Sequence, residues 1–365
     1  DEPSRARRDR LSSEAVALAR RTGDPAALAY ALDGRAAAIV APDTVEEGLA
    51  LGSELRDVAE RSGDPEQVVA GHLWRIIAQL QVGDVRGAQA DLAQANRIAE
   101  GLRQPAPLWE LRATQAMLAL ASGRLAAGEE LAGQAFALGE RAQPESAIPV
   151  HRLQRYMLCD LRSTLDDALP GLRELVAEYP ARPAFRCALA HAYARLGDGA
   201  EARRALDELA RDDFAAVPFD QEWLYGMSLL AETAALLGDA GHAAVLYRLL
   251  AQWEAFNVAD VAEGMRGSVA RYLGLLAATT GRWGGAERHF EHALAMNASM
   301  GAHAWLAHTH GDLAGMLLER GGPGDARRAL EHAGDALEAS RSMGMARLAA
   351  EAAALQRRAG GRRPP

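Results

Sequence analysis

The sequence predicts an all-α protein, a right-handed superhelical solenoid of about eight helical hairpins closed by a capping helix. The 365 residues are rich in Ala, Leu, Arg and Glu and only 5% aromatic, with few β-branched runs, which favours helix over strand. Turn-forming residues recur at nearly constant intervals. The apolar residues between them follow the helical period.

The recurring unit begins at a turn residue, usually glycine, and has a small residue five positions later. The copy "RLGDGAEARRALDEL" has Gly197, Ala202, Leu206 and Leu209 in these places. The intervals between successive turns are 40, 40, 40, 34, 41, 43 and 40 residues, too regular for chance. The turn residues are Asp43, Gly83, Gly123, Ser163, Gly197, Gly238, Gly281 and Gly321.

Each unit is predicted to be a hairpin of two helices. In "RPAFRCALAHAYARLG", Pro183 suits a first helical position and Gly197 supplies the left-handed residue that ends the helix. Asp198 can cap the next helix, and the small Ala202 lets the two helices approach closely. One hairpin cannot bury its apolar face alone, so neighbouring hairpins are expected to stack into a single solenoid over residues 1–360.

The two ends are expected to carry unpaired helices. "SRARRDRLSSEAVALARRTG" is interpreted as the second helix of a preceding unit, and the start at Asp1 as a sign of a longer parent protein. Residues 346–360 are expected to form the closing helix and 361–365 a disordered tail. The Gly-Asp-Pro sequences at 23–25 and 63–65 are interpreted as turns between units, where Gly ends one helix and Asp-Pro starts the next.

A small–large pattern in the fifth unit resembles tetratricopeptide repeats, whose ordinary period is 34 residues. The residues that carry this pattern are Ala190, Tyr193, Gly197, Ala202 and Leu206. Most units here are nearer 40 residues. In this longer period, and in segments 267–322 and 340–345 ("SRSMGM"), the chain resembles the tetratricopeptide-like C-terminal regions of large bacterial signalling ATPases.

These ATPases include maltose-regulator-type transcription activators and multidomain proteins with a nucleotide-cyclase domain. The resemblance implies a bacterial regulatory domain, in signalling or transcription regulation, that binds a protein or peptide segment or another domain of its parent. ATPase, cyclase and helix-turn-helix motifs do not occur in the sequence, so those activities are not assigned to it.

Composition argues against several function classes. The net charge of −9 gives no basic field for phosphates, so direct nucleic-acid binding is not expected. All 40 basic residues are arginine, which excludes a Walker A lysine and a Schiff-base lysine. Cys159 and Cys187 are too few for a disulfide framework or a four-cysteine zinc site. With no apolar run near 18 residues, we expect a cytoplasmic protein that does not enter membranes.

The sequence predicts a protein that is not an enzyme, with no catalytic, cofactor-binding or metal-binding residue assigned. No H-E-x-x-H or G-x-S-x-G motif occurs, and the carboxylates mostly stand at helical spacing from arginines. A histidine cluster leaves one question open: it could bind a metal, or its members could be ordinary packing and surface residues. The cluster comprises His289, His292, His303, His308 and His310.

Binding is expected on the concave surface, which the first helix of each hairpin lines. Counting back from each turn with the helical period gives Tyr30, Asp33, Glu110, Met117, Asp160, His191, Arg195, Tyr225, Glu232, Ser268, Arg271 and His308. In the second unit, Leu73, Ile77 and Leu80 form an apolar wall that suits an amphipathic partner. An open groove would favour a protein or peptide partner. An enclosed polar pocket would favour the alternative, a sensor for a small-molecule effector. An enzyme on a repeat scaffold is the third alternative.

Overall fold

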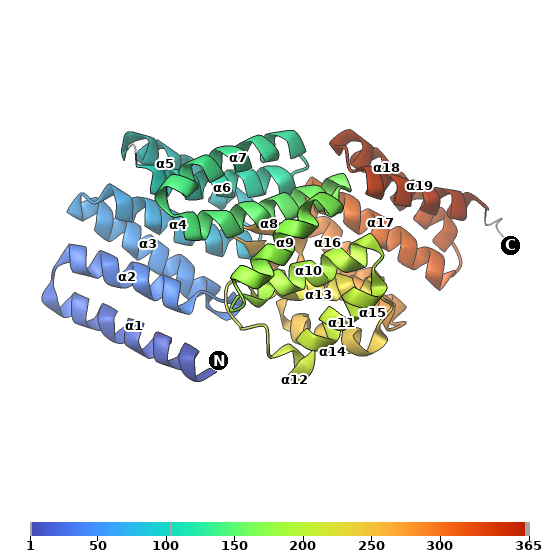
Figure 1. Cartoon of the computed structure of the whole chain (residues 1–365), viewed down its shortest axis with the longest axis horizontal. Coiled ribbons are helices and arrows are strands. Elements are labelled where there is room, and N and C mark those ends of the chain that lie inside the picture. Colours follow the sequence, from blue (N-terminus) through green and yellow to red (C-terminus); the bar gives the residue numbers. More distant parts are fainter. Residues whose placement is uncertain (1, 103, 362–365) are drawn as a thin grey trace.

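The structure is a computed structural model that describes residues 2–102 and 104–361. The all-α prediction is confirmed, because 83% of the chain is helical and consecutive helices pack against one another. Figure 1 shows α1 to α4 side by side at one end of the molecule and α17 to α19 at the other. The predicted helical-repeat solenoid is therefore the observed architecture.

The described residues form 19 α-helices, two 3-10 turns and two strands. The first part contains α1 (Glu2–Thr22), α2 (Pro25–Ile39), η1 (Pro42–Thr44), α3 (Val45–Ser62), α4 (Pro65–Gln81), α5 (Val85–Leu102), α6 (Pro105–Ala121), α7 (Leu125–Ala142), α8 (Pro144–Arg162) and α9 (Leu165–Glu178). The second part contains α10 (Pro183–Leu196), α11 (Gly199–Leu209), α12 (Arg211–Phe214), α13 (Trp223–Leu236), α14 (Ala240–Leu250), η2 (Ala251–Trp253), β1 (Asn257–Asp260), β2 (Gly264–Ser268), α15 (Val269–Thr279), α16 (Trp283–Ser299), α17 (His303–Arg320), α18 (Asp325–Met343) and α19 (Ala346–Gly361).

The predicted turns fall between the two helices of each hairpin. Seven of the eight turn residues adopt left-handed backbone with φ between 63° and 84°, namely Gly83, Gly123, Ser163, Gly197, Gly238, Gly281 and Gly321. The exception is Asp43, which lies in η1. Left-handed backbone ends a helix, and glycine adopts it without steric cost.

Gly-Asp-Pro forms the turn between units, as predicted. Gly23 and Gly63 are left-handed and follow α1 and α3. The Asp24 side chain accepts a hydrogen bond from the backbone N–H of Ala26, and the equivalent Asp64 caps α4. Each Asp-Pro pair therefore starts a helix, with proline where no backbone donor is needed.

Both end helices exist: α1 packs against α2, and α19 packs against α18. Gly361 is the last residue of α19, so the helix runs one residue beyond its expected end. The remainder of the expected tail, 362–365, lies outside the described residues.

A β-hairpin between α14 and α15 interrupts the helical series and was not predicted. Its strands β1 and β2 pair antiparallel, with Asn257 opposite Ser268, and every residue in both strands is buried. The hairpin contacts α4, α6, α8, α13, α15, α16 and α17, so it lies between early and late repeats. Asn257 Nδ2 donates to the Leu80 carbonyl at 2.9 Å, and Trp305 Nε1 donates to the Met265 carbonyl at 2.7 Å. These bonds fix the hairpin on both sides.

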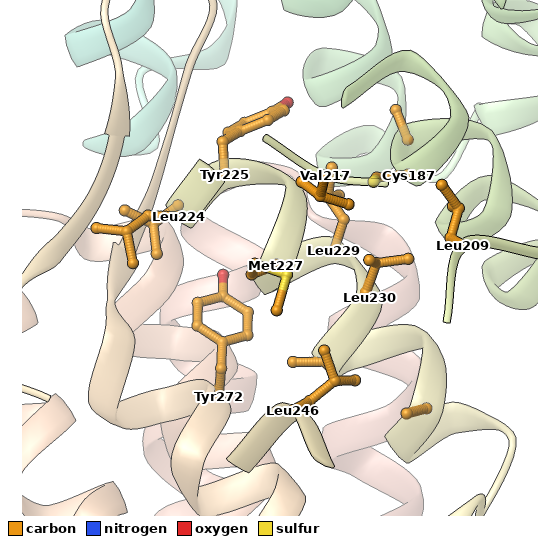
Figure 2. Close-up of a cluster of buried hydrophobic side chains, with 14 of the residues drawn as sticks. Cys187, Leu209, Val217, Leu224, Tyr225, Met227, Leu229, Leu230, Leu246 and Tyr272 are labelled. Carbon is orange, nitrogen blue, oxygen red and sulfur yellow. The ribbon is translucent and has the colours of Figure 1, made fainter. Parts of the chain in front are cut away.

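The buried apolar residues form several clusters, and the one with the most members includes α13. Figure 2 shows part of it, where Met227 and Leu230 of α13, Leu246 of α14 and Tyr272 of α15 gather together. Twelve of the fourteen residues of α13 are buried, because α10, α14, α15 and the hairpin all pack around it. This burial on all sides positions the polar residues that α13 also carries.

Late repeats also contact early ones directly. A second apolar cluster joins Leu80 and Leu120 to Met300, Trp305 and Met345. The backbone N–H of Arg347, in the first turn of α19, donates to Ser163 Oγ at 2.8 Å, and the two residues are 184 positions apart. Early and late repeats of the solenoid therefore contact one another, with the β-hairpin packed between them.

Candidate functional site

Half of the residues predicted to line the concave surface lie in one buried polar network. They come from the first helices of successive hairpins, α8, α10, α13, α15 and α17, so the repeat places them next to one another. These six residues are Asp160, His191, Arg195, Glu232, Arg271 and His308. The structure adds three members that the sequence did not single out: Tyr156, Arg266 and Asp312.

Glu232 is the centre of the network. It accepts a hydrogen bond from Arg266 Nη2 at 2.7 Å and another from Arg271 Nη1 at 3.1 Å. Arg271 Nε also donates to Asp312 Oδ2 at 2.7 Å. The side chains of both arginines are 1% exposed and that of Glu232 is 5% exposed. Arg266 comes from β2, so the hairpin supplies one of the two charges that balance Glu232.

A second branch of the network runs through His191. The Tyr156 hydroxyl and His191 Nδ1 lie 2.5 Å apart, and His191 Nε2 lies 3.6 Å from Glu232 Oε2. The order Tyr-His-Glu resembles a catalytic relay, but both the Tyr156 and His191 side chains are fully buried. Burial raises the pKa of Tyr156 well above its ordinary value, which is opposite to the activation of a nucleophile. This chain of groups therefore orders the core.

The charges in the network are fixed near neutral pH. Burial alone would raise the pKa of Glu232, but Arg271, His191 and Arg266 outweigh it and hold that pKa well below its usual value. Burial, together with Arg271 and Arg195, lowers the pKa of His308 to about 3. Glu232 is thus ionised and His308 neutral throughout the physiological range.

Above this network lies a groove of about 610 Å³, open to solvent. Its floor is formed by Arg195, Glu232, Arg271 and His308, four of the predicted binding residues. Apolar walls and acidic groups complete it, including Leu236, Leu275, Trp283, Leu355, Asp312, Glu319 and Glu351. These residues lie mainly on α13, α15, α17 and α19, so the groove occupies the inner faces of the last repeats.

The other predicted binding residues lie elsewhere. Tyr30 is 71% exposed, whereas Met117 is fully buried in the core and inaccessible to a partner. Asp33 accepts a hydrogen bond from Trp74 Nε1 at 2.7 Å. Ser268 caps α15 by accepting from the backbone N–H of Ala270, and Tyr225 is fully buried.

The predicted apolar wall of the second unit is partly occupied by the protein itself. Leu80 is fully buried, and its carbonyl accepts the hydrogen bond from Asn257 of the hairpin. Leu73 packs against the cluster that contains Leu80. A partner segment cannot reach this wall at Leu80 while the hairpin is in place.

Glu110, on α6, has an unusual protonation equilibrium. Burial, with the nearby charge of Asp33, raises its pKa from the ordinary 4.5 to about 7. The folded protein therefore keeps this proton up to about pH 7, whereas the unfolded chain releases it near pH 4.5. Between these values the folded state binds more protons, so this residue makes stability fall as pH rises.

Glu110→Gln is expected to remove this pH dependence. The variant should match the wild type near pH 4 and exceed its free energy of unfolding by ~1–3 kcal/mol at pH 8. Urea denaturation at both pH values measures the difference. Glu130→Gln, at an exposed position on α7, is the control and should show no such trend. An equal effect of Glu110→Gln at both pH values would contradict the assignment.

The predicted histidine cluster separates into different environments. His289 Nδ1 and His292 Nδ1 both bond Glu254 Oε1, at 2.8 and 3.2 Å. His303 is exposed, and His308 stacks on Trp305 with ring centroids 5.4 Å apart. His310 lies beside His332, a residue outside the predicted cluster.

Three carboxylates also converge at the tip of the hairpin. Ligand oxygens of Glu222, Asp260 and Glu263 lie within 4.8 Å of one another, and Arg182 donates to Glu222 and Glu263. Burial, then repulsion from Glu263 and Glu222, raises the pKa of Asp260 well above its ordinary value. Protonation of Asp260 and the positive charge of Arg182 therefore offset the negative charge of these three carboxylates.

One signal of the missed hairpin is present in the sequence. The longest interval between turns, 43 residues, separates Gly238 from Gly281, and the hairpin lies within it. Arg266 follows no helical period with the other candidates, because it lies on a strand.

No protein-family model matches the chain, and no curated protein matches it. Among the described helices, none combines the length and apolar character needed to cross a bilayer. The feature of the structure that bears on function is the groove over α13, α15, α17 and α19, with its charged floor.

Proposed function

We propose that this chain is a non-catalytic interaction and regulatory repeat domain that binds a protein segment in the groove of its last repeats. The observation that carries the proposal is the lining of the groove. Leu236, Leu275, Trp283 and Leu355 are at least partly exposed there, beside carboxylates that face solvent. Such a surface suits an amphipathic segment.

The charge of the groove specifies the partner further. Four carboxylates line it against two guanidinium groups, and His308 is neutral. Both guanidiniums are already paired, Arg195 with Asp160 and Arg271 with Glu232 and Asp312. Three of the carboxylates are paired as well, Glu232 with Arg266 and Arg271, Asp312 with Arg271 and Glu351 with Arg347, whereas Glu319 has no ion-pair partner among the described residues. Because Glu319 and Glu351 are the carboxylates exposed to solvent, the expected partner segment carries arginine or lysine on one face and apolar residues on the other.

The resemblance of segment 267–322 to repeat regions of bacterial signalling ATPases supports a wider role. On that basis we place the chain in a cytoplasmic signalling or transcription-regulating protein, where the segment belongs to a separate partner or to another domain of the parent. A small polar effector is the alternative, favoured by the volume of the groove, which lies in the range of small-molecule sites.

Peptide binding tests the proposal. The probe is a helical peptide with arginine on one face and leucine on the other, and a peptide with glutamate in place of arginine is its counterpart. Fluorescence anisotropy measures both affinities. We expect the basic peptide to bind and Glu319→Arg/Glu351→Arg to weaken it by at least ~10-fold, since both sites become repulsive.

The matched control is Glu130→Arg/Glu140→Arg, which makes the same charge change at exposed positions on α7. It should alter the affinity less than twofold. Equal weakening by both double variants, or equal binding of the acidic peptide, would contradict a specific groove. Binding of a small anion or metabolite pool with no peptide binding would favour the effector alternative.

A further inference from the structure

Three metal-ligating side chains converge between α17 and α18. His310 Nδ1 lies 3.0 Å from His332 Nδ1 and 3.5 Å from Asp335 Oδ2. All three ligand atoms lie within 4.8 Å of one another. His332 and Asp335 are three positions apart on α18, so one helical face presents both of them towards His310.

The separation of 3.0 Å between the two imidazole nitrogens is an ordinary hydrogen-bond length, and both separations are also close to those of a metal site. Two ligand atoms of a tetrahedral zinc ion, each ~2.1 Å from the metal, are ~3.4 Å apart. The two observed separations lie on either side of this value. His310 Nδ1 carries either one hydrogen or one lone pair, so a hydrogen bond can satisfy only one of its two neighbours. A cation between the three atoms satisfies all of them.

The surroundings allow a metal to enter. The Asp335 side chain is 61% exposed and that of His310 is 19% exposed, so solvent reaches the three atoms from one side. By contrast, His289 and His292 both bond Glu254 Oε1, but the ligand atoms of these three described residues do not all lie within 4.8 Å of one another.

We propose that His310, His332 and Asp335 bind a zinc-type divalent transition metal, with at least one coordination position open to water. Two imidazoles and one carboxylate suit zinc, cobalt or nickel rather than calcium or magnesium. The metal joins α17 to α18 and stabilises the last hairpin. None of the three residues lines the groove, so this site is independent of the proposed partner binding.

Cobalt titration tests the site. Tag-free protein is treated with EDTA, dialysed and titrated with Co²⁺ while visible absorption is recorded; Zn²⁺ is then added as competitor. We expect one saturable equivalent with a d–d spectrum that Zn²⁺ removes. His332→Ala should weaken Co²⁺ binding by at least ~10-fold. Loss of a residue that only supports a metal ligand commonly weakens metal affinity by this factor, so loss of a ligand should weaken it at least as much.

The control variant is His303→Ala, which removes an exposed histidine from the same helix and should leave the titration unchanged. Circular dichroism of the metal-free variants shows whether each is folded. Zn²⁺ should raise the melting temperature of the wild type and of His303→Ala but not of His332→Ala. No saturable binding by the wild type, or equal Co²⁺ affinity and equal Zn²⁺ stabilisation in His332→Ala, would overturn the proposal.

Discussion

Glu232→Ala is expected to lower the free energy of unfolding by about 3–5 kcal/mol, the largest effect of any single change considered for this protein. Glu232 is the shared partner of Arg266 and Arg271, whose side chains are almost completely buried. Arginine stays charged in proteins, so neither side chain can lose its charge when its partner is removed. Arg271 keeps Asp312, but Arg266 has no other carboxylate within salt-bridge distance among the described residues.

Chemical denaturation of the wild type and the variant measures this effect. Glu331→Ala is the control, because Glu331 pairs with Arg327 at a site where both side chains are more than half exposed. That change should alter stability by less than ~0.5 kcal/mol. If Glu232→Ala lowered the free energy of unfolding as little as Glu331→Ala, the buried network would not have the charge states described above.

Gly267→Ala is expected to destabilise the protein by ~2–4 kcal/mol, through left-handed backbone strain and overpacking together. Gly267 lies in β2 with φ of +74°. An added Cβ would lie 2.7 Å from both Asn297 Oδ1 and Trp305 Cβ. The strand cannot simply move away, because Asn297 Oδ1 accepts a hydrogen bond from the adjacent Ser268 N–H at 2.9 Å.

Gly324→Ala separates backbone strain from overpacking, the two causes of the expected destabilisation at Gly267. Gly324 has φ of +80°, but a Cβ there would meet nothing within 4 Å. It should therefore cost only the backbone strain, ~1–2 kcal/mol. Urea denaturation of both variants gives the comparison, and an equal loss at the two positions would show that the hairpin is not tightly held.

The turns were predictable because their cause is local. Left-handed backbone at a helix end selects glycine, and this residue type is visible at Gly83 or Gly197 without knowledge of the fold. Ser163 was found only from the interval, since serine seldom adopts this conformation. The convergence of Glu232 and Arg271 was likewise predictable, because the repeat places equivalent helix positions next to one another.

The hairpin was not predictable in the same way. Strands of four and five residues have little periodic signal, and β1 and β2 are stable only because helices from distant repeats bury them. Because the hairpin was not predicted, the sequence could not indicate that Leu80 is covered or that Arg266 pairs with Glu232. Counting back from each turn gave eleven candidates that lie on the first helices of their hairpins and one, Ser268, that ends β2, but it could not show which of them remain accessible.

Contacts between residues 80 and 257, and between 163 and 347, have a consequence for how this protein folds. In an ordinary linear repeat array, individual repeats can fold and unfold locally, because each repeat contacts only its neighbours. Here residues that are far apart in the sequence must come into contact before the native state is complete. The high contact order makes folding slower and more nearly all-or-none than the repetitive sequence suggests.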